Sequence, residues 1–515
     1  MKVFCALGLL FLVYNGALGA KILGVFPMVS HSHYTLGLSL MKELASRGHE
    51  VTFISPYPQK TPLKNFRDVS VEDIIEQVKG RKNDMLYTLY KQPFWKQISL
   101  VMDMGHMYTE DVFKLKNMQK LIESKEKFDL VIVEIFVNDA LLGLAHHFDA
   151  PLIVMAPGPM SFMCNHLVGN PSPSSYVPNI VSPFTTNMTI WERMQNLYYD
   201  IVGDLMVHFY GIPKHNEILQ RYIPDSPELK ELMYKVDLIL SPSHESINVP
   251  SPSVPAIKNV GGYHIPKPKP LPKDLQEFLD NAEEGAIVFS LGSNIKSADL
   301  PNTTKKAILN SFSKIKYKVL WKFETDLTDK PENVKIMKWL PQNDVLAHPN
   351  VKLFMSHGGL LSVIEAINYG KPILGVPVFW DQQLNIKSAA DSGFAISLPF
   401  YDITEEKLDY ALKEMLTNPK YTVNAKKRQS ILLDQPLSPM DTAIFWIEHI
   451  IRQKGGDHLR SPGLNLYWYE RNMLDIIIIL TLITVVIFTI FYIIFKHILK
   501  IFGKKPAVKK SKKNQ

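Results

Sequence analysis

The chain has 515 residues, of which 46% are hydrophobic and 21% are charged. This composition excludes a largely disordered protein, and the length exceeds what one hydrophobic core usually organises, so we expect two domains with additional segments. The net charge of +7 is carried by eight lysines between residues 496 and 515, without which the balance is −1. The body of the protein is therefore near neutral, which argues against nucleic-acid binding.

The N-terminus has the pattern of a secretory signal. Residues 1–20 combine a lysine, an apolar run and a small-residue end, which predicts a cleaved signal peptide, with an uncleaved anchor as the alternative. Cys5 would leave with this peptide, and Cys164 would be the single remaining cysteine, so we expect no internal disulfide. Asn187 and Asn302 each begin an Asn-x-Thr triplet, which is a glycosylation acceptor in a secretory compartment.

The C-terminus has the pattern of a membrane anchor. We expect a transmembrane helix at 474–495, because its last twenty residues carry no charge and can span a bilayer at about 1.5 Å per residue. The basic tail at 496–515 follows, so the positive-inside rule predicts a single-pass type I protein with a lumenal body and a cytosolic C-terminus. Lys512 and Lys513 resemble a dilysine signal for the endoplasmic reticulum membrane, and a generic stop-transfer tail is the alternative.

Strand and helix patterns alternate on both sides of a proline-rich stretch. Eight prolines fall between residues 241 and 273, a density that predicts a linker. A helical pattern at 34–47 lies between two strand patterns, as in a βαβ unit. We therefore expect two parallel-sheet, Rossmann-like α/β domains, 21–245 and 246–470, with ligands in the cleft between them. The strand patterns lie at 22–26, 51–54, 130–133, 151–155, 286–290, 319–321, 334–337, 351–355 and 373–376.

The segment from Phe354 to Gln383 carries the clearest chemistry. A buried strand is followed by a Ser-His-Gly-Gly turn and a helix expected to begin near Leu360. Glycines and free backbone N–H groups at such a turn can hold a diphosphate without a metal, although a Gly-Gly turn alone would also suit ordinary packing. Carboxylates and amides further along could accept from ribose and sugar hydroxyls. The candidate donor-site residues of this segment are His357, Gly359, Ser362, Glu365, Asp381 and Gln382.

This segment resembles the signature of the UDP-glycosyltransferase family. Trp339–Pro349 resembles the family segment that receives uracil, in which Trp339 would stack on the base and Gln342 would lie near the nucleoside. Phe289–Ser293 resembles the loop that touches phosphate, and it adds Ser293 to the candidate donor site. The resemblance thus extends the expected nucleotide site from one segment to three.

The resemblance covers residues 21–505. Leu360, Leu361 and Ser362 stand where vertebrate relatives usually have Thr-Asn-Gly, so it is nearest to the invertebrate branch. Phe445–Glu448 resembles part of the closing helices that return to the first domain. Together these motifs imply a GT-B fold, a UDP-sugar as co-substrate, and no metal or other cofactor.

The resemblance also implies a catalytic base. Family members transfer the sugar with inversion, so a base has to remove the acceptor proton. His33 matches the family's histidine on the loop after the first strand, and the start of the following helix disfavours a charged ring; His31 is the nearby alternative. Glu134 matches the carboxylate that orients the histidine, with Asp139 as the alternative. Either carboxylate could instead cap the helix near Ala140.

The acceptor side is less well defined. The stretches 85–107 and 155–163 mix apolar and aromatic residues, which suits either a lipophilic acceptor or ordinary packing. We predict a hexosyltransferase of EC 2.4.1 type that transfers glucose, or another hexose, to a small lipophilic hydroxyl compound, as in detoxification. The alternatives are a glycolipid-synthesising transferase and a non-catalytic carrier of lipophiles or UDP-sugars. A homo-oligomer is compatible with each of these.

Overall fold

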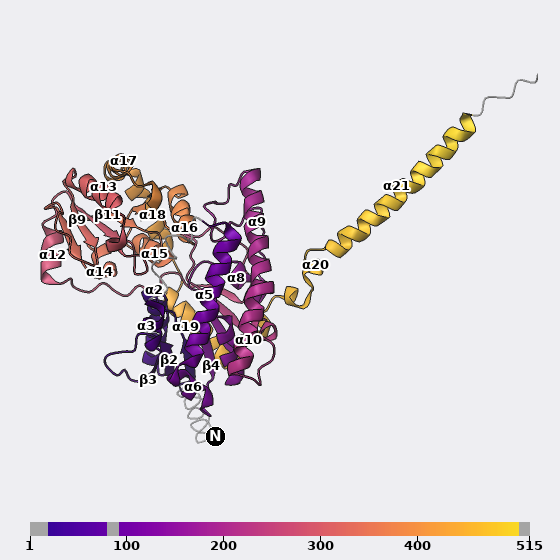
Figure 1. Ribbon diagram of the computed structural model, residues 1–515, viewed down its shortest axis with the longest axis horizontal. Coiled ribbons are helices and arrows are strands. Elements are labelled where there is room, and N and C mark those ends of the chain that lie inside the picture. Colours follow the sequence, from indigo (N-terminus) through magenta and orange to yellow (C-terminus); the bar gives the residue numbers. More distant parts are fainter. Residues whose placement is uncertain (1–18, 80–91, 504–515) are drawn as a thin grey trace, which may run out of the picture. The chain divides into compact units, whose positions relative to one another are not determined.

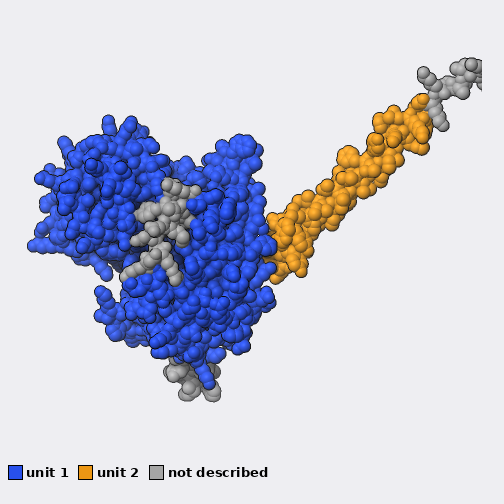
Figure 2. All heavy atoms as spheres, in the orientation of Figure 1, with its two compact units in different colours: residues 1–461 blue, residues 462–515 orange. Residues whose placement is uncertain are grey.

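The computed structural model describes residues 19–79 and 92–503 (Figure 1). The predicted signal peptide, apart from its last two residues, lies outside the described residues. The beginning of the 85–107 stretch and the Lys512–Lys513 pair also lie outside them. The chain up to Ser461 forms one compact unit, and the chain from Pro462 forms a second (Figure 2).

The first domain is built on a seven-stranded sheet with the order β3-β2-β1-β4-β5-β6-β7. All neighbouring strands are parallel, and the central strands are almost wholly apolar, as expected where helices cover both faces of a sheet. The strands are β1 (Lys21–Val25), β2 (Glu50–Ser55), β3 (Phe66–Ser70), β4 (Leu130–Glu134), β5 (Leu152–Met155), β6 (Leu238–Ser241) and β7 (Ile257–Asn259). The helices are α2 (His31–Ser46), α3 (Asp73–Lys79), α5 (Phe94–Lys114), α6 (Lys116–Glu123), η1 (Asp139–Leu142), α7 (Gly143–His147), α8 (Phe162–Asn165), η2 (His166–Val168), α9 (Ile190–Met206), η3 (Val207–Gly211), α10 (Ile212–Tyr222) and α11 (Leu229–Met233).

The second domain is built on a six-stranded parallel sheet with the order β10-β9-β8-β11-β12-β13. Alternate residues of β8 enter two different apolar clusters, Val288 one and Phe289 the other, so both faces of this sheet are covered. The strands are β8 (Ala286–Ser290), β9 (Lys318–Lys322), β10 (Val334–Met337), β11 (Val351–Ser356), β12 (Ile373–Gly375) and β13 (Ala395–Ser397). The helices are α12 (Lys273–Asp280), η4 (Ser297–Asp299), α13 (Asn302–Ser313), α14 (Gln342–Leu346), α15 (Leu360–Asn368), α16 (Gln382–Asp391), η5 (Phe400–Asp402), α17 (Glu405–Thr417) and α18 (Lys420–Leu433).

The chain crosses between the two sheets twice. The first crossing is the proline-rich linker after β7, and the second follows α18 and leads into α19 (Pro439–Gln453). The apolar face of α19, including Ala443, Ile444 and Ile447, is buried in the core of the first domain. This return agrees with the closing helix expected around Phe445–Glu448. The short η6 (Asp457–Leu459) follows α19 in the same unit.

The expected domain boundary at residues 245 and 246 has to be corrected. Ile257–Asn259 forms β7, which pairs with β6 as the seventh strand of the first sheet. A three-residue strand inside a proline-rich stretch has too short an alternating pattern to be recognised. The first domain therefore extends to Asn259, and it also includes α19, which lies within the range 246–470 expected for the second domain.

One local expectation near the site also differs from the structure. The loop expected to run to His33 ends at Ser30, whose extended backbone (φ −146°) precedes the first residue of α2, so His33 is the third residue of that helix. In the second domain, Asp381 is the residue before α16 and Gln382 is its first residue. The predicted end of α2 is confirmed, because Gly48 has a left-handed φ of +99° directly after the helix.

The second unit holds the expected apolar helix. It contains η7 (Pro462–Asn465), α20 (Trp468–Arg471) and α21 (Leu474–Phe502). Within the 29 residues of α21, the most apolar 18-residue window has a mean hydropathy of 3.0, and none of that window is buried within the structure. In the part of the chain that the structure describes, α21 is the one helix long and apolar enough to cross a membrane, by length and composition.

Candidate active site

His33 and Glu134 form a buried hydrogen-bonded pair. Strands β1 and β4 are parallel neighbours, with Val25 opposite Val133, so the helix that follows β1 begins beside the last residue of β4. His33 Nδ1 donates a hydrogen bond to Glu134 Oε1, and Glu134 is fully buried while His33 is 15% exposed. With the proton on Nδ1 facing the carboxylate, Nε2 keeps its lone pair and can accept a proton.

The structure separates the two carboxylates that the sequence left open. Glu134 contacts His33, whereas Asp139 lies in η1 with Oδ2 3.5 Å from Nε2 of His215. Burial raises the pKa of Asp139 and lowers the pKa of His215 to about 3. Asp139 therefore belongs to a second buried cluster in the first domain.

Aromatic rings surround the His33 side chain. Phe136, two residues after Glu134, meets the His33 ring edge-on with centroids 5.2 Å apart. Trp380, which comes from the second domain and has a left-handed φ of +60°, meets Phe136 edge-on at 6.2 Å. Burial, and after it the charge of Glu134, raise the pKa of Tyr108 well above its usual value, and its hydroxyl donates to the carbonyl of Pro27. The imidazole thus lies in an apolar, partly enclosed setting.

Two glycine turns of the second domain lie against the His357 ring. Gly292 follows β8 with φ +79°, and a Cβ there would lie 2.6 Å from the His357 ring. Gly358 follows β11 with φ +86°, and a Cβ there would lie 2.4 Å from Ile386. Both positions therefore require glycine. Gly359 precedes α15, which begins at Leu360 as the sequence predicted. The first backbone N–H groups of α15, which have no partner within the helix, therefore lie next to the turn at Gly358 and Gly359.

His357 is held neutral at this site. Burial, and after it the charge of Lys322, lower the pKa of His357 to about 4. Among the described residues, its Nδ1 has no hydrogen-bond partner. A neutral imidazole whose buried Nδ1 has no partner can donate a hydrogen bond to a bound ligand or accept one from it.

Lys322 is a further candidate site residue, which no sequence motif indicated. It is the last residue of β9, next to β8 in the sheet, so it lies at the carboxyl edge where the two glycine turns begin. Its Nζ donates to Glu324 Oε1 at 2.7 Å and lies 5.7 Å from the centroid of the Trp339 ring. A lysine directly after the three apolar residues Val319–Trp321 was the available signal. It supplies positive charge beside the expected diphosphate.

The expected nucleoside residues are gathered at α14 and α15. Trp339 is 55% exposed, which leaves a face free for stacking. Gln342 Nε2 donates to Glu365 Oε2 at 2.7 Å and to Ser362 Oγ at 3.1 Å. Burial raises the pKa of Glu365 to about 7, and the hydrogen bond from Gln342 opposes that shift. The structure thus joins Gln342, Ser362 and Glu365 directly.

The Asp381–Gln382 pair faces two ways. Asp381 Oδ2 accepts from Asn385 Nδ2 at 2.8 Å. Burial raises the pKa of Asp381 to about 6, while the charge of His33 acts in the opposite direction, so Asp381 lies within electrostatic reach of His33. Gln382 Oε1 instead accepts from the backbone N–H groups of Val378 and Phe379, at 2.9 and 3.2 Å. Its carbonyl oxygen is therefore engaged within its own loop.

The remaining predicted residues are placed as follows. Ser293 is half-buried in the loop after β8, next to Asn294, whose Nδ2 donates to Ser30 Oγ at 3.3 Å. His31, the alternative base, meets Trp339 edge-on at 5.1 Å and stacks on Tyr57. Asn187 and Asn302 are both exposed. Among the described residues, no group of three or more His, Cys, Asp or Glu side chains could hold a metal ion.

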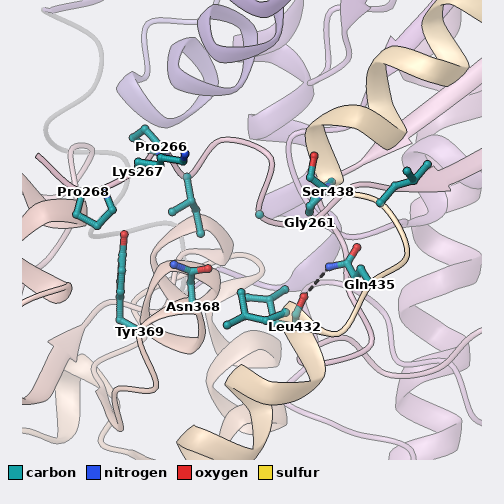
Figure 3. A pocket seen from close by; sticks show the side chains of 14 residues that line it. Gly261, Pro266, Lys267, Pro268, Asn368, Tyr369, Leu432, Gln435 and Ser438 are labelled. Carbon is teal, nitrogen blue, oxygen red and sulfur yellow. Dashed lines mark hydrogen bonds between the residues drawn. The ribbon is translucent and has the colours of Figure 1, made fainter.

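Two cavities flank these residues. The smaller, about 20 Å³, lies under η3 and includes Met102, Met163, Asp139 and His215 in its lining, so both expected acceptor stretches contribute one residue to it. The larger, about 500 Å³, lies between the two chain crossings (Figure 3). It is lined by Gly261, Gly262 and residues 265–268, by Asn368 and Tyr369, and by residues of the 432–439 segment. None of the predicted site residues lines the larger cavity.

The fold and the site define a glycosyltransferase of GT-B architecture. Two domains, each built on a parallel sheet, meet through contacts such as His31–Trp339, with the His33–Glu134 pair in the first and the glycine turns around His357 in the second. Solved glycosyltransferases have the same fold. The glycotransferase of kitacinnamycin is 16% identical with a TM-score of 0.57, covering 84% of this chain and 99% of that one. LpCGTa in complex with UDP is 17% identical with a TM-score of 0.52, covering 85% and 100%.

The chain belongs to the UDP-glucoronosyl and UDP-glucosyl transferase family, whose model matches residues 20–514. UDP-glucosyltransferase 2 of Dactylopius coccus is 34% identical over 488 residues, which cover 94% of this chain and 93% of that protein. UDP-glucuronosyltransferase 2B10 of Homo sapiens is 32% identical over 493 residues, covering 90% and 91%. The protein is therefore a glycosyltransferase whose co-substrate is a UDP-sugar.

Proposed function

We propose that the protein transfers a hexose, glucose in the first instance, from a UDP-sugar to the hydroxyl of a small lipophilic acceptor with inversion. The observation that carries this proposal is the hydrogen bond from His33 Nδ1 to the buried Glu134 Oε1. It leaves Nε2 as a proton acceptor in an apolar setting. A base in this state is what an in-line displacement by a neutral hydroxyl needs.

The reaction balances with the residues present. His33 Nε2 takes the proton of the acceptor hydroxyl, the acceptor oxygen forms a bond to the anomeric carbon, and the bond from that carbon to the UDP oxygen breaks. UDP leaves with the electron pair. The positive charge of Lys322 and the N–H groups at the start of α15 stabilise the departing diphosphate.

Six further residues bind the sugar nucleotide in this proposal. Trp339 stacks on uracil, and Gln342 and Glu365 contact the nucleoside, with Glu365 accepting from the ribose. His357 and Ser293 touch the diphosphate. Asp381, within electrostatic reach of His33, accepts from the sugar hydroxyls next to the reacting carbon. Support for this assignment is that the residues cluster at the carboxyl edges of the second sheet.

The proposed setting is the endoplasmic reticulum membrane. Support comes from α21, whose most apolar 18-residue window has a mean hydropathy of 3.0, from Tyr467 and Trp468 before it, and from the lysines that begin at Lys496. Asn187 and Asn302 are exposed, so both could carry glycans in a lumenal body. In this setting the enzyme would conjugate lipophilic foreign compounds.

The direct test is turnover in microsomes that contain the protein. A panel of UDP-sugars is combined with a panel of lipophilic acceptors, and products are identified by mass. We expect product from UDP-glucose with at least one hydroxyl acceptor. Product found only in extracted membrane lipids would favour a glycolipid-synthesising transferase, and no consumption of any UDP-sugar would favour a carrier. Mobility shifts after deglycosylation would report whether the body is lumenal.

A further inference from the structure

Two consecutive linker residues contact the two helices that matter most for the proposed reaction. Tyr263 is buried in the core of the first domain, and its hydroxyl donates to the carbonyl of Leu36 in α2 at 3.0 Å. The side chain of His264 is 1% exposed, and its Nε2 lies 3.8 Å from Glu365 Oε1 in α15. Because α2 carries His33, this pair joins the helix of the base to the helix of the proposed ribose carboxylate.

The backbone explains why neighbouring side chains face different domains. Gly262, directly before the pair, has a left-handed φ of +96°, which reverses the chain as it leaves the first sheet. The Tyr263 and His264 rings are nearly perpendicular, with an interplanar angle of 88°. Both residues lie in the first crossing between the domains, so any shift of one domain relative to the other has to move them.

The imidazole of His264 is poorly satisfied. Among the described residues, neither ring nitrogen has a hydrogen-bond partner of ordinary geometry. Burial lowers the pKa of His264 to about 4, and a weak hydrogen bond to the backbone of Leu361 opposes the shift, so the ring is neutral at neutral pH. A buried polar group without a close partner is costly, and a bond that forms in a ligand-bound state removes that cost.

The Glu365 carboxylate is held on one side only. Its Oε2 accepts from Gln342 Nε2 at 2.7 Å, while Oε1 faces His264 beyond hydrogen-bond range. Among the described residues, Tyr369, which directly follows the same helix, also senses the charge of this carboxylate. Burial, and after it the charges of Glu365 and Asp344, raise the pKa of Tyr369 to about 12, so its hydroxyl stays protonated.

We propose that His264 is a positioning residue for the UDP-sugar, whose Nε2–H closes onto Glu365 Oε1 when the ribose engages that carboxylate, and that Tyr263 carries this movement to α2. A closure of about 1 Å brings the two atoms to hydrogen-bond distance. Leu36 lies one helical turn beyond His33, so the linker transmits donor binding to the base. This inference rests on the ribose role proposed above for Glu365.

The test measures UDP-glucose binding by calorimetry to the full-length protein in detergent, between pH 6.0 and 8.5. The diphosphate of this ligand does not titrate in that range, so the pH dependence reports protein groups. Burial raises the pKa of Glu365 to about 7, and its ionised form is the acceptor, so affinity should rise with pH through that region. His264→Leu should lower affinity about tenfold at pH 7.5, as for one lost hydrogen bond to a charged group, and shift the midpoint to higher pH.

Three further variants separate the possible causes. His264→Gln keeps an N–H donor and should restore most of the affinity. His244→Leu removes another buried histidine of the same region, one that bonds to Ser246, and should lower stability without changing affinity or midpoint. Glu365→Gln should bind weakly and without the pH step. If Glu365→Gln binds like the unmodified protein, the proposed donor site is wrong, independently of His264.

The proposed role of Tyr263 is tested through the turnover rate. Tyr263→Phe removes the hydroxyl that bonds to Leu36 and should lower kcat several-fold while the UDP-glucose affinity stays unchanged. An unaltered affinity and midpoint in a folded His264→Leu protein would overturn the positioning role. An unaltered kcat in Tyr263→Phe would overturn the transmission to α2.

Discussion

The ring of Trp339 meets the ring of His31 edge-on, with centroids 5.1 Å apart. Trp339 belongs to the second domain and His31 is the first residue of α2, two positions before His33. Trp339, the proposed stacking residue for uracil, therefore contacts the same first turn of α2 that carries His33, the proposed base. This contact places His31, the alternative base, against Trp339, whereas His33 contacts Glu134.

Replacing each histidine should separate chemistry from donor binding. His33→Ala should lower kcat by about 10²- to 10⁴-fold, because a general base is lost, while UDP affinity stays within about twofold of the unmodified protein. His31→Ala should instead raise the KM for the UDP-sugar and leave kcat within a few-fold. Steady-state kinetics with calorimetric UDP binding provide the check, and undiminished turnover in His33→Ala would remove the base assignment.

Replacing each carboxylate should show which one orients His33. Glu134→Gln should lower kcat by about 100-fold, because an amide does not hold the Nδ1 proton as a buried carboxylate does. Asp139→Asn should keep kcat near normal, since Asp139 contacts His215. Equal losses of kcat in two folded variants would contradict this division, and thermal melting establishes that both are folded.

The pH dependence of donor binding should contain a step from Asp381. Burial raises its pKa to about 6, and only the ionised carboxylate is a pure acceptor for sugar hydroxyls. Affinity for UDP-glucose should therefore increase as pH rises through about 6. Asp381→Asn should remove this step and leave any step near pH 7 in place. Binding is measured instead of turnover, so that the protonation of the base does not contribute.

Lys322 should contribute to diphosphate binding. Lys322→Met should weaken UDP binding about tenfold or more, as expected for a lost charge-assisted hydrogen bond, and affect uridine binding much less. Lys371→Met is the matched control, because Lys371 is a second buried lysine whose Nζ donates to the carbonyls of His348 and Val351. That variant should melt at a lower temperature and bind UDP normally. A Lys322→Met protein with normal UDP affinity would limit Lys322 to its pairing with Glu324.

The parts of the site that could be predicted are local in the chain. The strand, glycine turn and helix around Leu360 follow one another within a few residues, so composition and spacing were sufficient. The direction of the Gln382 carbonyl could not be predicted, since it depends on which backbone N–H groups of its loop turn inward.

Residues brought in from distant segments were missed for a related reason. Lys322 reaches the site because β9 lies next to β8, and His264 reaches Glu365 only through the left-handed turn at Gly262. The seven-stranded order of the first sheet was likewise not available from patterns, because β7 is short and its partner is set by tertiary packing.

The return of α19 to the first domain has a consequence for synthesis of the protein. Its buried residues Ala443, Ile444, Ile447 and Ile450, together with Leu459, complete a core whose other buried members all come before residue 264. During translation the first domain cannot finish its packing until nearly the whole second domain has left the ribosome. The two domains are thus tied in the order of their folding, and neither is expected to be stable when expressed without the other.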